Sequence, residues 1–78
     1  MAKYFFDVQG TRSDFPDEEG LELEGPEAAE VEALKALPDL GRDVFPDGGD
    51  RTLTTAVRTA DGVVIFRATL TLKCERTA

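Results

Sequence analysis

The chain has 78 residues, of which 41% are hydrophobic, and its nine Lys and Arg against sixteen Asp and Glu give a net charge of −7. A chain of this length predicts one domain, residues 1–78, with a small core. The apolar content excludes a disordered acidic tail, and no apolar run approaches the ~20 residues that cross a bilayer. With no His and one Cys, the catalytic Ser-His and Cys-His pairs and a zinc site are also excluded.

The negative charge is concentrated in the first half of the chain, where residues 1–38 carry ten of the acids and three of the bases. Because nucleic acids and anionic membranes bind basic surfaces, the sequence predicts neither as a partner. A basic partner protein or a metal cation fits this charge better. Cys74 cannot form an internal disulfide, so we expect a reducing, cytoplasmic compartment.

Alternation of apolar residues predicts the first strand over residues 3–9. One face of this strand would enter the core with Tyr4, Phe6 and Val8. Phe5 and Asp7 point the other way.

Turn-forming residues follow over 10–16, and the acidic segment 17–20 predicts a tight turn because Gly20 can adopt a positive φ. Residues 21–24 alternate again as a short second strand. Four acids in or near this turn either offer oxygen ligands to Ca²⁺ or Mg²⁺ or form a solvated turn: Asp14, Asp17, Glu18 and Glu19.

A helix is predicted from Pro26 to about residue 45, because proline is favoured at the first helical position. Its buried side would consist of Ala29, Ala33, Ala36, Leu37, Leu40 and Val44. Pro38 lies inside this pattern. Because proline removes a helical hydrogen bond, we expect either a kinked helix or two abutting ones.

Turn residues at 46–50 end the helix, and two β-rich runs follow at 51–60 and 63–72. The Asp61-Gly62 pair between them predicts a two-residue type I′ hairpin. In the last strand, one face would carry Val64, Phe66, Ala68, Leu70 and Leu72.

The predicted fold is α+β, in the order β-β-α-β-β, with an antiparallel sheet and one kinked helix on one face. Because one helix covers only one face, the other face meets water or a partner. The candidate partner-binding residues on that face are Phe5, Ile65, Arg58 and Arg67. Phe5 and Ile65 either form a contiguous apolar patch, which would mark a partner surface, or are exposed singly. Arg58 and Arg67 either oppose each other or pair with an acid such as Asp7.

Several short segments occur in order along almost the whole chain: Tyr4-Phe5-Phe6-Asp7-Val8, Asp17-Glu18-Glu19-Gly20, Glu27-Ala28-Ala29, Glu32-Ala33-Leu34, Leu37-Pro38-Asp39, Pro46-Asp47-Gly48 and Arg67-Ala68-Thr69-Leu70. Taken together, this series resembles a small bacterial family classed as a domain of unknown function. The resemblance implies a stand-alone cytoplasmic bacterial domain, and it implies no activity or ligand.

The function predicted from these observations is that of a small acidic protein-interaction or scaffolding domain. Self-association as a homodimer would use the open sheet face or an edge strand. We expect no catalytic activity and no cofactor. The alternative is a domain that binds a divalent cation or small ligand through the acidic turn at 14–19.

Overall fold

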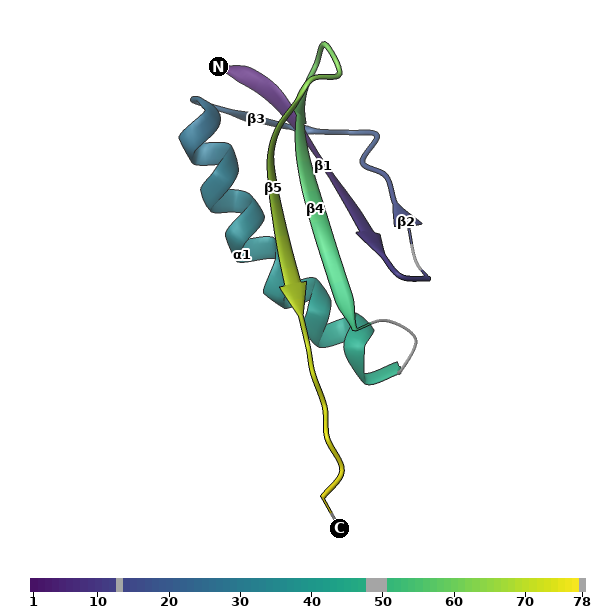
Figure 1. The fold of residues 1–78 in the computed structure, drawn as a ribbon. Helices are drawn as coiled ribbons and strands as arrows, with labels where there is room; N and C mark the ends of the chain where they lie inside the picture. The colour runs from purple at the N-terminus through teal and green to yellow at the C-terminus, as the bar shows by residue number, and fades with distance from the viewer. Residues whose placement is uncertain (13, 48–50, 78) are drawn as a thin grey trace.

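The computed structural model describes residues 1–12, 14–47 and 51–77. Its elements are β1 (Ala2–Gly10), β2 (Asp14–Phe15), β3 (Leu21–Leu23), α1 (Pro26–Val44), a 3₁₀ turn (Phe45–Asp47), β4 (Thr52–Thr59) and β5 (Val64–Thr71). The strands form one antiparallel sheet in the order β2-β1-β4-β5, and β3 also pairs with β1. Helix α1 covers one face of this sheet (Figure 1). The predicted α+β class and antiparallel sheet are therefore confirmed.

Strand β2 was not predicted, so the chain order is β-β-β-α-β-β. Phe15 pairs with Val8 and Asp14 with Gln9. A strand of two residues contains no alternation, so nothing in the local pattern distinguishes it from a turn.

Helix α1 continues through Pro38, so the expectation of two abutting helices is wrong. Pro38 is exposed, and it leaves the Leu34 carbonyl without its usual helical partner. The 3₁₀ turn Phe45–Asp47 follows the helix, whereas residues 48–50 of the predicted turn lie outside the described residues.

The buried side of α1 consists of residues four apart: Ala29, Ala33, Leu37 and Gly41. Each step of four rotates about 40° around the helix, so the buried stripe winds along α1. Ala36 was predicted to be buried and is exposed, because the stripe has turned away from it.

The core lies between α1 and the sheet in two clusters. The first contains Tyr4, Ala29, Ala33 and Val57, with Phe6 and Phe66 partly buried against it. The second contains Leu37, Phe45 and Leu53, with Ala68 and Leu70 packed against it. The prediction that Tyr4 and Phe6 enter the core is confirmed, and Phe66 of β5 packs with them.

The hairpin between β4 and β5 differs from the predicted type I′ turn. The Gly62 N–H donates to the Thr59 carbonyl at 2.9 Å, and the Thr59 N–H donates to the Val63 carbonyl at 2.9 Å. Gly62 has φ 87°, and no described non-glycine residue has a positive φ. This geometry is a three-residue loop, in which a type I turn is followed by one glycine in the left-handed region.

Strand β5 is irregular near this loop. Val57 pairs with Phe66 but Arg58 pairs with Val64, so β5 contains one extra residue in a bulge. Val64 and Leu72, which alternation placed on one face with Phe66, Ala68 and Leu70, are both exposed. The bulge interrupts the alternation at Val64, and Leu72 lies beyond the end of the strand.

Candidate functional site

Arg58 is the centre of a polar cluster on the face of the sheet away from α1. Its Nε donates to Asp7 Oδ2 at 2.7 Å, and its Nη2 donates to the Asp17 carbonyl at 2.9 Å. The guanidinium also lies 4.5 Å from the centre of the Phe5 ring, a cation–π distance. The predicted pairing of Arg58 with Asp7 is confirmed, whereas Arg67 lies opposite Ala56 instead of Arg58.

Asp17 connects the acidic turn to β1. Its Oδ2 accepts the Phe6 N–H at 3.0 Å, and its Oδ1 accepts the N–H groups of Glu19 and Gly20, each at 3.1 Å. β2 pairs with the end of β1 and β3 with its beginning, so the Asp17 carboxylate satisfies a backbone donor between these two short strands. Sequence reasoning missed this role because the bond to Phe6 joins residues eleven apart.

The charges of this cluster shift one another's protonation. The hydrogen bond from Arg58 holds the pKa of Asp7 below its usual value, although partial burial opposes it. Partial burial raises the pKa of Asp17, but three backbone N–H bonds outweigh it and the pKa lies below the usual value. The bond to Asp7 raises the pKa of Arg58. All three groups are therefore charged at neutral pH, and they fix the turn onto the sheet.

The four acids of the predicted cation site do not converge. Asp14, Glu18 and Glu19 are exposed, and both carboxylate oxygens of Asp17 accept backbone hydrogen bonds. Within the described ranges of the chain, no three Asp, Glu or Cys side chains lie close enough to hold a metal ion. The geometry therefore gives the cation alternative no support.

The two apolar candidates on the outer face are separated. Phe5 is half-buried, and a Cβ built on Gly20 would lie 2.9 Å from its ring, so the turn covers part of this residue. Ile65 is 39% exposed and lies in β5. Arg58 of β4 lies opposite Phe5 and stands between the two.

Strand β5 has a free edge, since within the described residues it pairs only with β4. The Leu72 N–H donates to the Arg51 carbonyl at 2.7 Å, which places the backbone groups of residue 72 toward β4. By alternation, the N–H and C=O groups of Arg67, Thr69 and Thr71 point to the free edge.

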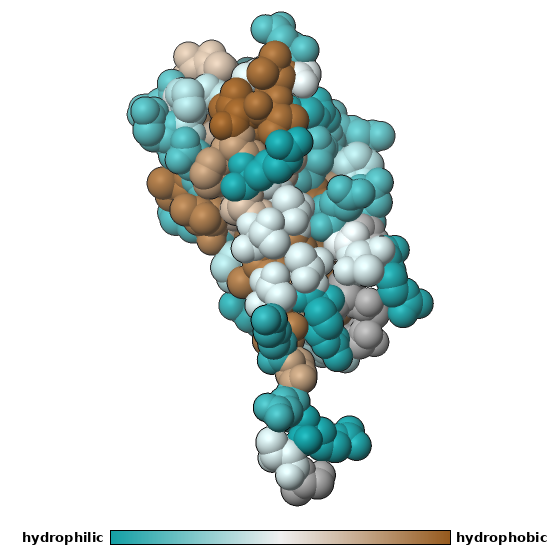
Figure 2. Space-filling model, viewed as in Figure 1, coloured by the Kyte–Doolittle hydropathy of each residue, from teal (hydrophilic) through white to brown (hydrophobic). Residues whose placement is uncertain are grey.

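Exposed apolar side chains lie at both ends of this edge. They are Val63, Val64 and Ile65 near the hairpin and Leu72 at the other end. Figure 2 shows hydrophobic surface near the hairpin and a second hydrophobic area over α1. Both areas lie on the side of the molecule that presents β5 and α1 together (Figure 1).

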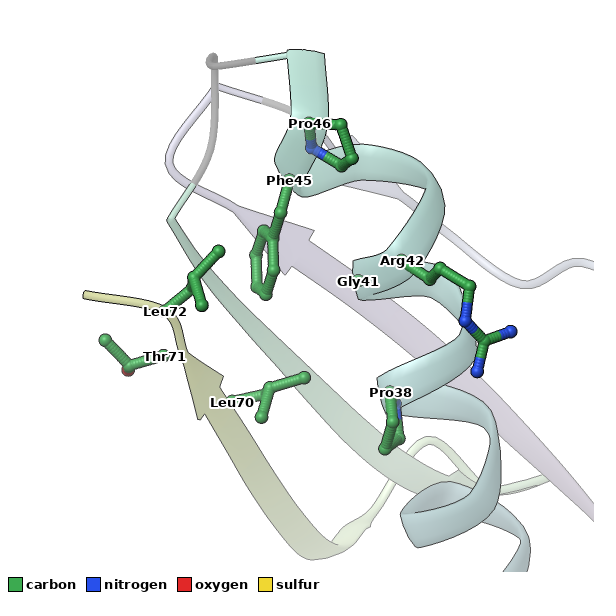
Figure 3. Close-up of a pocket in the computed structure, with 8 residues that line it drawn as sticks. All are labelled: Pro38, Gly41, Arg42, Phe45, Pro46, Leu70, Thr71 and Leu72. Carbon is green, nitrogen blue, oxygen red and sulfur yellow. The ribbon is translucent and has the colours of Figure 1, made fainter. Parts of the chain in front are cut away.

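An open apolar groove of about 380 Å³ lies between the end of β5 and the second half of α1. It is lined by Pro38, Gly41, Arg42, Phe45, Pro46, Leu70, Thr71 and Leu72 (Figure 3). Phe45, Leu70 and Leu72 point into it, whereas the guanidinium of Arg42 points away. A Cβ on Gly41 would lie 3.1 Å from the Phe45 ring and 3.2 Å from Leu70, so glycine allows α1 to approach β5 this closely.

The flank of α1 beside this groove carries an exposed stripe. Residues at spacings of three and four share one side of a helix, and the side that contains Pro38 and Arg42 also contains Glu27, Val31 and Leu34. Val31 is 49% exposed and Leu34 is 57% exposed. Together with the free edge of β5 and the groove, this helix flank forms one continuous candidate binding surface.

An edge strand was predicted as one of two possible dimer surfaces, with Ile65 and Arg67 named on β5, whereas the groove and the helix flank were not predicted as sites. The helix flank looks like an ordinary helix edge in the sequence, because exposure of Val31 and Leu34 depends on where α1 lies across the sheet. The signal that could have identified it is the spacing of these two apolar residues outside the alanine-rich buried stripe.

No helix in the described part of the chain is long and apolar enough to cross a membrane. A search of curated proteins found no match to the chain, and neither did a search of solved structures. A family model does match, over residues 3–71. By that match, which covers most of the chain, the protein belongs to the family described as domain of unknown function DUF6894.

Proposed function

We propose that this domain is a non-catalytic protein-interaction module that binds an added strand of a partner along the free edge of β5. The observation that carries the proposal is the edge itself, a strand of eight residues with outward backbone groups at Arg67, Thr69 and Thr71. Strand addition of this kind obtains affinity from main-chain hydrogen bonds and specificity from pockets for alternate side chains. The groove beside Leu70 and Leu72 is such a pocket.

The two edges of the sheet differ in a way that supports this function. On one edge, β2 and β3 have only two and three residues. Between them, the Phe6 N–H already donates to the Asp17 carboxylate and cannot bind an added strand. Short edge strands of this kind resist further pairing. β5 is more open to pairing, because it has eight residues and no proline, its bulge lies at the hairpin end, and it carries one charged residue, Arg67.

The non-catalytic part of the proposal is supported by the chemistry of the surface hollows. The apolar groove carries only Arg42 and Thr71 as polar side chains, and a second hollow is lined by Gln9, Gly10, Thr11, Thr52 and Thr54. Neither set offers an acid, base or activated nucleophile. We also propose that the domain is cytoplasmic, because the exposed free thiol of Cys74 suits a reducing compartment.

Selection from a library of displayed ten-residue peptides tests this proposal. The domain is immobilised sparsely so that two copies do not meet. We expect enrichment of peptides that alternate apolar and polar residues, and binding that shifts the amide NMR signals of Arg67, Thr69 and Thr71.

The control uses two substitutions at one position. Arg67→Pro removes an N–H that points to the free edge, whereas Arg67→Ala removes the side chain and keeps that N–H. Binding should be lost in the first variant and retained in the second. Peptides that bind both variants equally, or that shift amides outside β5, would overturn the proposal.

A further inference from the structure

We infer that the partner at β5 is a second copy of this chain. In this arrangement, which rests on the proposed function, two β5 strands pair antiparallel about a two-fold axis that is perpendicular to the sheet and passes beside Ala68. Both sheets then join into one, and both α1 helices lie on the same face of it. The exposed flanks of the two helices face each other across the axis.

The spacing of the elements fits this arrangement. Helix α1 packs about equally on β4 and β5, so its axis lies near the line midway between them. Neighbouring strands are about 4.8 Å apart, so the two-fold axis lies about 2.4 Å beyond β5 and about 4.8 Å from the helix axis. Two helices related by that axis are then about 9.6 Å apart, within the usual packing distance of 8–10 Å.

The flank of α1 is self-complementary in charge. It begins with Glu27, continues with the apolar residues Val31, Leu34 and Pro38, and ends with Arg42. When two such flanks run antiparallel, Glu27 of each copy lies near Arg42 of the other, and the apolar residues meet at the centre. The midpoint of the stripe lies between residues 34 and 35, less than one helical turn from Leu37, which belongs to the core cluster against which Ala68 packs.

The register of the two β5 strands follows from their side chains. Pairing centred on Arg67 would place two guanidinium groups opposite each other, which is unfavourable. Pairing centred on Ala68 places Arg67 opposite Thr69, and it places Phe66 opposite Leu70 on the face toward the helices.

A strand from an unrelated protein would cover the β5 edge but leave Val31, Leu34 and Pro38 in water. A second copy covers the edge and the helix flank together. The helix flank therefore identifies a second copy as the occupant.

Charge reversals test this inference, with sedimentation equilibrium from micromolar to millimolar protein as the measurement. Glu27 and Arg42 are fifteen residues apart, about 22 Å along the helix, so they cannot pair with each other within one chain. Within its own chain, Arg42 forms an exposed ion pair with Asp39 at 3.1 Å. We expect wild-type dimers, and each single variant, Glu27→Arg or Arg42→Glu, should raise the dissociation constant about tenfold because each alters two symmetry-related contacts. The mixture of the two variants should restore the dimer, since each supplies the charge that the other lacks.

The control is Asp43→Arg, a charge reversal on the opposite side of α1, which should leave the dissociation constant unchanged. Circular dichroism checks that every variant is folded. A monomeric wild type, or a mixture no tighter than its separate components, would overturn the inference. If the peptide selection still finds ligands for the edge, the proposed function stands and the occupant is a different protein. If both experiments fail, the proposed function fails as well.

Discussion

Asp17 holds the acidic turn against β1 through backbone hydrogen bonds. Asp17→Ala leaves the N–H groups of Phe6, Glu19 and Gly20 without this acceptor. The N–H groups of Phe6 and Gly20 are partly buried and would lose their acceptor, whereas the exposed N–H of Glu19 would bind water. We therefore expect the free energy of unfolding to fall by about 1–3 kcal/mol. Urea unfolding measures it. The control is Glu18→Ala at the neighbouring, exposed position, which should change stability by less than about 0.5 kcal/mol. Equal losses in both variants would contradict the role of Asp17.

Asp7 and Asp17 make the stability of the fold depend on pH. Both pKa values are lower in the folded chain than the value of about 3.9 for an unperturbed Asp, so the unfolded chain binds protons first as the pH falls. Their contribution is fully present above about pH 5 and is lost as the pH falls through the folded-state pKa values. The urea midpoint should therefore decrease from about pH 5 toward pH 2.

Asp7→Asn isolates one part of this effect. The variant should be less stable than wild type at neutral pH, because Arg58 loses its ionised partner, and its stability should vary less with pH. A variant with the same pH dependence as wild type would show that the ion pair does not contribute.

Gly20 and Gly62 both have a positive φ, and comparing alanine substitutions at the two positions distinguishes the cost of backbone strain from the cost of steric crowding. Gly62→Ala should cost about 1–2 kcal/mol, because φ is 87° and nothing lies within 4 Å of the new Cβ. Gly20→Ala has similar strain at φ 74°, but its Cβ would also lie 2.8 Å from Lys3 Cγ and 2.9 Å from the Phe5 ring. We expect Gly20→Ala to cost about 1–3 kcal/mol more than Gly62→Ala in urea unfolding. Equal costs would mean that the turn does not press on Phe5.

At the scale of elements, the register of paired β5 strands is testable by oxidation. In a Cys74→Ser background, Ala68→Cys would meet its own copy at a non-hydrogen-bonded position, where Cα atoms are about 4.5 Å apart and a disulfide can form. We expect a covalent dimer on a non-reducing gel. Arg67→Cys and Thr69→Cys should each remain mostly monomeric alone and cross-link when mixed. Rapid self-cross-linking of Arg67→Cys would indicate the other register.

The elements that were predicted from the sequence are those whose burial repeats with a regular period. Alternation predicted β1 and the hairpin strands, and a helical period predicted α1, because each pattern reports which side of one element is buried. The same alternation placed Asp7 and Arg58 on the outer face, but it left open whether Arg58 pairs with Asp7 or opposes Arg67, which depends on the strand register. β2 was too short to carry such a pattern.

The remaining features depend on how elements meet. The bond between Asp17 and the Phe6 N–H exists because β2 and β3 leave a gap along β1, which no local pattern reports. The exposure of Leu34 depends on the lateral position of α1, which lies over β4 and β5 and not over the middle of the sheet. The candidate surface therefore became visible only when the elements were assembled.

At the scale of the whole molecule, association at β5 links stability to concentration. A dimer that forms only from folded chains stabilises them by mass action. Above the dissociation constant, each tenfold rise in concentration adds about 0.7 kcal/mol per chain, which raises the Tm of a domain of this size by about 3–6 °C. Calorimetry over a concentration series should show this rise in wild type and Arg67→Ala but not in Arg67→Pro, whose β5 edge lacks an N–H. A wild-type Tm that is independent of concentration would place the domain among monomers and leave the β5 edge and the α1 flank free for a different partner.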